Sequence, residues 1–311
     1  MPPPHRELRK LVRKLGVAAR PTEQENALAT LSALCHDPDN RAAIAAAGAI
    51  PDLVVLLGPA VPAGVQDAAG ALMSLAEDAD NKIMIAAAGA IPPLVQLLGP
   101  SSSAEMQQMA AGALQNLSVN ADNDVAIVAA GAIPLLVQLL APGSSAGVQE
   151  NAAGAVRNLS ENADKQVTIA AAGAIPPLVQ QLGRGSPFGV LQAASALRNL
   201  IVNAENQVTI AAAGAIPPLV LLLGPGSSAR AQRITVGALM FLAQTAENLG
   251  AMNAAGAIPA MKLLLRSSSD ADTKMYASRT LVSLGDSNAD TRVGAAEANA
   301  EVQEAIGALH I

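Results

Sequence analysis

Aromatic residues are almost absent from this chain of 311 residues, which has no Trp, one Tyr (Tyr276) and two Phe (Phe188 and Phe241). This scarcity argues against a protein that stacks nucleic-acid bases on aromatic rings. Charged residues are also few, at 14%, while hydrophobic residues reach 51%. Because a disordered chain has the opposite balance, the composition predicts a folded protein with a core of Ala, Leu, Ile and Val.

Cysteine is equally scarce, and the single Cys35 excludes an intrachain disulfide. The first twenty residues are basic but are not followed by the apolar segment of a signal peptide. We therefore expect a reducing compartment, the cytoplasm, with the nucleus left open. The alternative is a secreted protein whose leader has been removed.

Catalytic and metal-binding patterns are missing as well. His5, His36 and His310 are dispersed, and their spacing does not suggest a zinc site. There is no phosphate-binding loop ending in Gly-Lys, no Gly-x-Ser-x-Gly and no His-Glu-x-x-His. We interpret Cys35 as a structural thiol, since its adjacency to His36 is no indication of a nucleophile and its base. The sequence thus predicts no catalytic residue, no cofactor and no metal ion.

Glycine and proline are plentiful, with 25 and 20 residues, and they mark a repeat. The tetrapeptide Gly-Ala-Ile-Pro begins at six positions with spacings of 41 or 42 residues. These positions are Gly48, Gly89, Gly131, Gly173, Gly214 and Gly256. A constant period of this length is typical of a solenoid, in which each unit stacks on its neighbours.

Each unit is predicted to contain three helices, so the fold class is all-α. In the second unit the first helix covers residues 81–88 and ends at Gly89, which can adopt the left-handed conformation. The second helix starts at Pro92, where a missing N–H has no cost, and ends at Gly99. The third helix covers residues 104–118, because its apolar residues recur at helical spacing.

One uncharged stretch is long enough to cross a membrane. It lies between Glu205 and Arg230 and has 24 residues. Gly-Pro elements at 214–218 and 224–226 interrupt it, and one straight helix cannot run through both. We therefore expect no transmembrane segment.

Two segments, NADNDVAIVAAGAIPLLVQLL (120–140) and ENAAGAVRNLSENADKQVTIAAAGAIPPLVQQL (150–182), resemble armadillo repeats, especially those of plants and algae. The resemblance covers roughly residues 22 to 285. It implies a right-handed α-solenoid, an armadillo superhelix, whose third helices line a concave groove. We expect one structural domain with an N-terminal cap and partial repeat at 1–38, six repeats at 39–285 and a C-terminal cap at 286–311.

The two ends of the chain are expected to cap the solenoid. Residues 6–15 place Leu8, Leu11, Val12 and Leu15 on one face of a helix whose remaining face is basic. The basic face is interpreted as a solvated cap surface, with a targeting signal or an anionic-membrane patch as alternatives. Residues 22–35 are expected to form the third helix of a partial unit, and residues 290–311 a polar cap.

The informative positions lie near the end of each third helix, and we call them the ladder positions. They are Ala33, Ser74, Asn116, Asn158, Asn199, Phe241 and Ser283. An Asn amide both donates and accepts, so a row of exposed amides suits the backbone of an extended peptide. In armadillo families related to nuclear import adaptors and catenins, such a ladder has this role. The alternative is that each Asn bonds the turn that follows its own helix.

Nuclear import adaptors carry a Trp four residues before the ladder Asn, and this chain departs from that pattern. The corresponding residues are Gly70, Gly112, Gly154, Ser195 and Gly237. The resemblance therefore does not extend to recognition of basic nuclear signals. Nothing in the chain resembles a U-box.

The charge distribution favours an acidic ligand. The chain carries a net charge of −6, yet residues 157–233 contain more Lys and Arg than Asp and Glu. The predicted peptide-binding residues are Gln115, Asn116, Arg157, Asn158, Arg198, Asn199 and Arg233. Ordinary solvated arginines are the alternative. The net charge and the lack of a basic stripe argue against nucleic acid as a partner.

Together these features predict a non-catalytic, monomeric protein–protein interaction module that binds an extended, acidic or phosphorylated segment of another protein. The alternative is an adaptor or substrate-recognition subunit of a larger assembly, such as a ubiquitin ligase or a vesicle-tethering or transport complex. An enzyme would need an enclosed pocket with convergent titratable groups.

Overall fold

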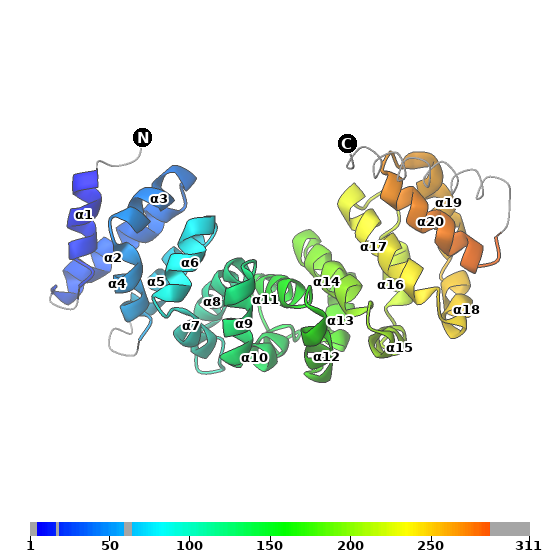
Figure 1. Ribbon diagram of the computed structural model, residues 1–311, viewed down its shortest axis with the longest axis horizontal. Helices are drawn as coiled ribbons and strands as arrows, with labels where there is room; N and C mark the ends of the chain where they lie inside the picture. Colours follow the sequence, from blue (N-terminus) through cyan, green and yellow to red (C-terminus); the bar gives the residue numbers. More distant parts are fainter. Residues whose placement is uncertain (1–4, 17–18, 59–63, 287–311) are drawn as a thin grey trace. The chain divides into compact units, whose positions relative to one another are not determined.

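The computed structural model describes residues 5–16, 19–58 and 64–286, apart from the side chains of His5 and Pro21. Within these ranges there are twenty α-helices and no β-strand (Figure 1). The predicted C-terminal cap at 290–311 lies outside the described residues. The all-α class is therefore confirmed for the part of the chain that the structure describes.

The helices follow the predicted order of six three-helix repeats. The first helices are α3 (Pro38–Ala46), α6 (Ala79–Ala87), α9 (Ala121–Ala129), α12 (Ala163–Ala171), α15 (Ala204–Ala212) and α18 (Ala246–Ala254). The second helices are α4 (Ala49–Leu56), α7 (Ile91–Leu97), α10 (Ala132–Leu139), α13 (Ile175–Arg184), α16 (Ile216–Leu221) and α19 (Ala257–Ser267). The third helices are α5 (Val65–Leu75), α8 (Ala104–Leu117), α11 (Ala146–Leu159), α14 (Pro187–Leu200), α17 (Ala229–Leu242) and α20 (Ala271–Ser283).

The recurring Gly-Ala-Ile-Pro segment works as a corner between first and second helices. All six glycines have φ between 80° and 88°, a left-handed conformation that other residues adopt with strain. The alanine that follows each glycine is 0% exposed, which leaves no room for a larger side chain. The proline then falls in the first turn of the second helix, where no N–H is needed. The geometry of the turn between the two helices thus accounts for the Gly, the Ala and the Pro of the segment.

By its contacts the chain divides between Leu159 and Ser160 into two compact units. The first unit holds the repeats from α3 to α11, preceded by α1 (His5–Arg13) and α2 (Pro21–Cys35), and the second holds the repeats from α12 to α20. In the first unit α2 packs on α5, α5 on α8 and α8 on α11. In the second unit α14 packs on α17 and α17 on α20. The expectation of one structural domain stays a prediction, because each unit is described by itself.

The first helices share two sets of hydrogen bonds that the sequence patterns did not predict. One set caps the start of the helix, and the other joins it to the preceding third helix. Asp78 accepts hydrogen bonds from the backbone N–H groups of Asp80 and Asn81, which satisfies free donors at the helix start. The Asn81 amide then donates to the Leu75 carbonyl at the end of the preceding third helix, at 3.2 Å. Asn40, Asn123, Asn206 and Asn248 make the same bond to the residue six positions earlier.

The helix α1 has the predicted amphipathic character. Leu8 is 0% exposed and Val12 7%, while Leu15, just beyond the helix, is 1% exposed. The Gln24 side chain donates to the Leu15 carbonyl at 2.6 Å and ties the end of this segment to α2. The apolar face therefore packs on the first unit, and the basic face is left outward.

Among the described residues no single helix is both long and apolar enough to span a membrane. One pair, α9 with α10, passes the same length and composition test only when the two are joined, and that pair is bent by 87°.

Candidate functional site

Consecutive third helices form a row in each unit, and we call this surface the third-helix row. It consists of α5, α8 and α11 in the first unit and α14, α17 and α20 in the second (Figure 1). Every residue that the sequence predicts to bind peptide lies on one of these helices. The hydrogen bonds among the side chains of the row determine which amide and guanidinium groups remain available to a ligand.

The ladder amides bond across repeats. Asn116 Nδ2 donates to the Met73 carbonyl of the preceding third helix at 2.9 Å, and Asn158 Nδ2 donates to the Gln115 carbonyl at 2.8 Å. Both carbonyls belong to the last four of a helix, which have no partner within the helix. Each amide therefore caps the third helix of the repeat before it. The alternative of a bond to the following turn does not describe these contacts.

Asn158 corrects the expectation that the ladder amides are exposed. Its side chain is only 6% exposed, and its amide also donates to Ser118 Oγ at 3.0 Å. Arg157 Nε donates to Asn158 Oδ1 at 3.0 Å, so the amide is bonded at both ends. Asn199 donates to Ser160 Oγ at 3.2 Å within the second unit. These groups are satisfied by the fold itself and by the adjacent arginine.

Asn116 differs from Asn158 in one respect. Its side chain is half-buried, and its Oδ1 accepts no hydrogen bond from any described residue. Of the predicted amide ladder, Asn116 therefore keeps an acceptor that a peptide N–H could use. Peptide contact by the three amides stays a prediction.

The small residues four positions before the ladder make room for neighbouring side chains. A Cβ added at Gly112 would collide with Met73 of the preceding third helix and lie 2.9 Å from Asn151 of the following one. At Gly154 it would collide with the Gln115 amide, and at Gly70 it would lie 3.5 Å from Met109 Sδ. The side chains that cover these glycines come from two positions, one and seven residues before the ladder. A Trp at any of these sites would displace them.

In the second unit the same two positions carry Arg198 and Tyr276, which flank Gly237. A Cβ there would lie 3.1 Å from Arg198 Nε and 3.5 Å from two carbons of the Tyr276 ring. Arg198, Arg233, Ile234, Asp272 and Tyr276 together line a cavity of about 180 Å³. The third-helix row of the second unit is therefore hollowed at this point.

The electrostatics of this cavity are unbalanced. Arg233 approaches Asp272 at 3.6 Å, and their side chains are 49% and 46% exposed. An exposed pair at this distance contributes little to stability. Arg198 is half-buried and has no hydrogen bond or ion pair with any described residue. The cavity thus holds two guanidinium groups and a single carboxylate.

The sequence predicts part of this cavity and misses part. Arg198 and Arg233 were both predicted, and the structure brings them together in the second unit. Gln115, Arg157 and Asn158 form a separate group in the first unit. Asp272, Tyr276 and Ile234 were missed. The signal that could have found Tyr276 is its position seven residues before a ladder position, where its ring can lie over a glycine.

Cys35 has the character of a structural thiol. It is 0% exposed, and burial raises the pKa of the Cys35 thiol to about 12. The His36 ring bonds the Ser32 carbonyl at 2.8 Å. Groups of three or more His, Cys, Asp or Glu that could hold a metal ion do not occur among the described residues.

Comparisons with known proteins agree with this architecture. A family model described as Armadillo/beta-catenin-like repeat matches residues 78–119 and 120–161. A solved structure called designed armadillo repeat protein YIII(Dq)4CqI is 29% identical, with a TM-score of 0.69, over 76% of this chain and 99% of that one. Another, designed armadillo repeat protein YIII(Dq.V1)4CPAF in complex with peptide (KR)4, is 29% identical with a TM-score of 0.65 and covers 76% of this chain and 99% of that one. No curated protein matches this chain.

Crystal structures of engineered proteins are also similar. One has a TM-score of 0.77 and 29% identity over 94% of this chain and 72% of that one. A second is 30% identical over 76% of this chain and 97% of that one, with a TM-score of 0.68. With the six repeats, the Gly-Ala-Ile-Pro corners and the third-helix row in place, the chain belongs to the armadillo repeat family. Its assignment to the plant or algal type stays a prediction.

Proposed function

We propose that this protein is a non-catalytic protein-binding scaffold that holds an extended, acidic segment of a partner protein along its third-helix row. The observation that carries the proposal is the cavity of the second unit, where the Arg198 guanidinium lacks an anionic partner beside Arg233 and Tyr276. A half-buried guanidinium gains most from a bidentate carboxylate or phosphate, which matches its planar donors.

The size of the cavity fits a single side chain. At about 180 Å³ it is smaller than the pockets that enclose whole small-molecule ligands, which are roughly 300–1,000 Å³. An acidic or phosphorylated residue of an extended peptide could reach Arg198 and Arg233, while the peptide backbone lies on the row. The Tyr276 ring would pack against the aliphatic part of that residue.

The structural neighbours support peptide binding as the general role. One designed armadillo repeat protein is in complex with the peptide (KR)4, which is basic. The arginines of the present chain argue for a ligand of the opposite charge. We therefore infer that the scaffold is shared and that the charge preference is reversed.

The test is selection from a display library of random peptides, with phosphoserine versions of the enriched sequences made by synthesis. The wild-type protein should enrich peptides that contain an acidic residue. Replacing both Arg198 and Arg233 by Gln should remove that enrichment. The matched control replaces Arg230 and Arg266, which are exposed arginines of the second unit, and should retain it.

Two outcomes would contradict the proposal. The wild type could enrich basic or neutral peptides, or the enriched peptides could bind the Arg198→Gln/Arg233→Gln variant with unchanged affinity. Circular dichroism on both variants separates loss of binding from loss of fold.

We further propose that the protein acts as a monomer in the cytoplasm, as its sequence favours. Light scattering with and without an enriched peptide tests the monomer, and fractionation of cells that make the protein tests the location.

A further inference from the structure

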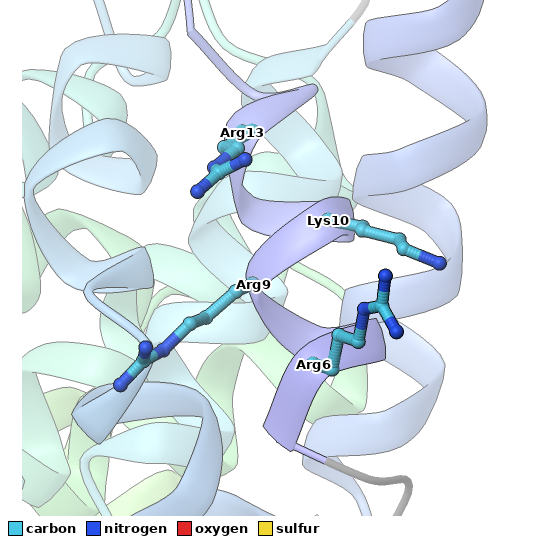
Figure 2. Close-up of a pocket in the computed structure, with 4 residues that line it drawn as sticks. All are labelled: Arg6, Arg9, Lys10 and Arg13. Carbon is cyan, nitrogen blue, oxygen red and sulfur yellow. The ribbon is translucent and has the colours of Figure 1, made fainter.

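The outward face of α1 carries a concentration of positive charge that peptide binding on the third-helix row does not use. Arg6, Arg9, Lys10 and Arg13 lie within an arc of about 100° when successive residues turn by about 100°. All four side chains are exposed. Figure 2 shows Arg6 and Lys10 extending to one side of the helix and Arg9 to the other, with Arg13 one turn above.

These cations are largely uncompensated. Lys10 pairs with Glu7 at 2.7 Å on the same helix. Arg6, Arg9 and Arg13 have no hydrogen bond or ion pair with any described residue through their side chains. The four basic residues line one open hollow of about 610 Å³. Among the described residues, the lining of the hollow is therefore positive charge from a single helix.

The helix that carries the charge is held in place. Its apolar face is buried, and α1 packs against both α2 and α3. The bond from Gln24 to the Leu15 carbonyl fixes the segment that follows. The cations are thus displayed on a fixed helix, and a ligand would not have to order this segment first. Since the apolar face is already used, binding to this surface must be electrostatic.

We propose that α1 docks this protein on an anionic membrane surface, with a polyphosphorylated lipid headgroup in the hollow. Phosphate groups match several guanidiniums at once, and the hollow lies within the range of about 300–1,000 Å³ that encloses one small ligand. Clusters of four or more basic residues on an amphipathic helix are typical of such headgroup sites.

Charge argues for a membrane rather than a nucleic acid. The basic cluster is confined to one helix of 9 residues, in a chain whose net charge is −6. A nucleic acid needs a longer basic track to neutralise successive phosphates. A lipid headgroup needs only the one hollow. A membrane that contacts α1 alone does not require the acidic remainder of the protein to approach the anionic lipids.

The experiment is co-sedimentation of the full chain with three kinds of vesicle. They are phosphatidylcholine alone, phosphatidylcholine with phosphatidylinositol bisphosphate, and phosphatidylcholine with phosphatidylserine at the same total charge. The test variant replaces Arg6, Arg9, Lys10 and Arg13 by Gln. The matched control replaces three arginines and one lysine of the second unit by Gln, namely Arg230, Arg266, Lys274 and Arg279.

The wild type should sediment with the phosphoinositide vesicles and much less with the other two. The test variant should bind at least about tenfold more weakly, since each basic residue near an anionic surface contributes measurably to binding. The control should bind as the wild type does, and soluble inositol hexakisphosphate should release the wild type from the vesicles. All variants should keep the helical circular dichroism of the wild type, because the exchanged residues are exposed, apart from Lys274, which is half-buried.

Three results would overturn the inference. The wild type could bind phosphatidylserine vesicles equally well, the control could lose as much binding as the test variant, or a single-stranded RNA oligomer could bind more tightly than the phosphoinositide vesicles at the same salt. The last result would assign the cluster to nucleic acid. None of these outcomes bears on peptide binding by Arg198 and Arg233.

Discussion

In the first unit, Met73 and Asn151 flank Gly112, whereas in the second unit Arg198 and Tyr276 take the equivalent places around Gly237. The first pair is uncharged. The second pair leaves a cavity with an unpaired guanidinium. The backbone arrangement is the same in both units, since each contains the same helix types joined by the same corners.

The comparison shows that the residues that build the fold of this chain and the residues that line the cavity occupy different positions in the repeat. The corners, the buried alanines and the Asn side chains of the first helices recur in both units and build the fold. The positions one and seven residues before the ladder vary in residue type, and in the second unit Arg198, Ile234 and Tyr276 at these positions line the cavity. The cavity is thus formed without a change in the corners or the buried alanines.

The largest effect is expected when the charge of the cavity is reversed. Replacing Arg198 and Arg233 by Glu should weaken an acidic peptide by about 100-fold or more, because two charge-assisted hydrogen bonds are lost and repulsion is added. The affinity should be measured by fluorescence polarisation at low and high salt, since exposed charges are screened. Equal weakening by Arg230→Glu with Arg266→Glu would show that only the net charge matters.

A second, smaller effect is expected on the stability of the first unit, where Asn158 is buried and hydrogen-bonded. Asn158→Ala should lower the free energy of unfolding by about 1–3 kcal/mol, because the buried Asn158 amide loses its bonds to Ser118 Oγ and to the Gln115 carbonyl, which keeps only the Ser118 hydroxyl as a donor. Asn253→Ala, at an exposed site on α18, should change it by less than about 0.5 kcal/mol. Urea denaturation measures both. An Asn158→Ala protein of unchanged stability but weaker peptide binding would return Asn158 to the role of ligand contact.

Cys35 offers a pH-dependent probe of the first unit, since it is the only cysteine of the chain. Burial raises its pKa to about 12 in the folded protein, from a value of 9.0. The unfolded state therefore loses the thiol proton first as pH rises, and stability should fall between pH 9 and pH 12. The loss should be roughly 1.4 kcal/mol for each pH unit above the unfolded pKa.

The measurement is urea denaturation at pH 8 and pH 10, compared with a Cys35→Ala variant that lacks the titrating group. The comparison removes the contributions of all other groups, because these are the same in both proteins. An equal loss of stability in both proteins would contradict the assignment of the effect to Cys35.

The smallest effect is expected at the glycines of the row. Gly237→Ala should change stability by less than about 1 kcal/mol, since the gain in helix propensity offsets the displacement of Arg198 Nε, 3.1 Å from the new Cβ. Gly154→Ala should give a similar small change by moving Gln115. Only Gly237→Ala should alter the preference for an acidic peptide, because the group displaced there is the Arg198 guanidinium, whereas Gln115 is uncharged.

The sequence predicts the scaffold well because its signals are local. The left-handed glycines, the first-turn prolines and the helical spacing each act within one repeat, so the expected helices of the second repeat match α6, α7 and α8 within two residues. The ladder asparagines illustrate the limit. Asn158 and the carbonyl that it bonds are 43 residues apart, and its burial depends on how one repeat packs on the next.

The cavity of the second unit could be predicted only in part for the same reason. Arg198 and Arg233 were found from the local charge and their place on third helices. Asp272 and Tyr276 belong to the last repeat, and their approach to the arginines depends on the packing of α20 on α17. Side chains that meet across repeats carry no signal within a single repeat.

The measurement that tests the central claim most directly is the position at which a bound peptide touches the third-helix row. A benzophenone amino acid should be placed at Ile234, which lines the cavity of the second unit, and at the equivalent Met109 of the first unit. An acidic peptide selected by the wild type should be captured on irradiation from position 234 and not from position 109, with capture reduced by added salt. Equal or stronger capture from position 109, or capture from neither position by a peptide that binds, would contradict the account.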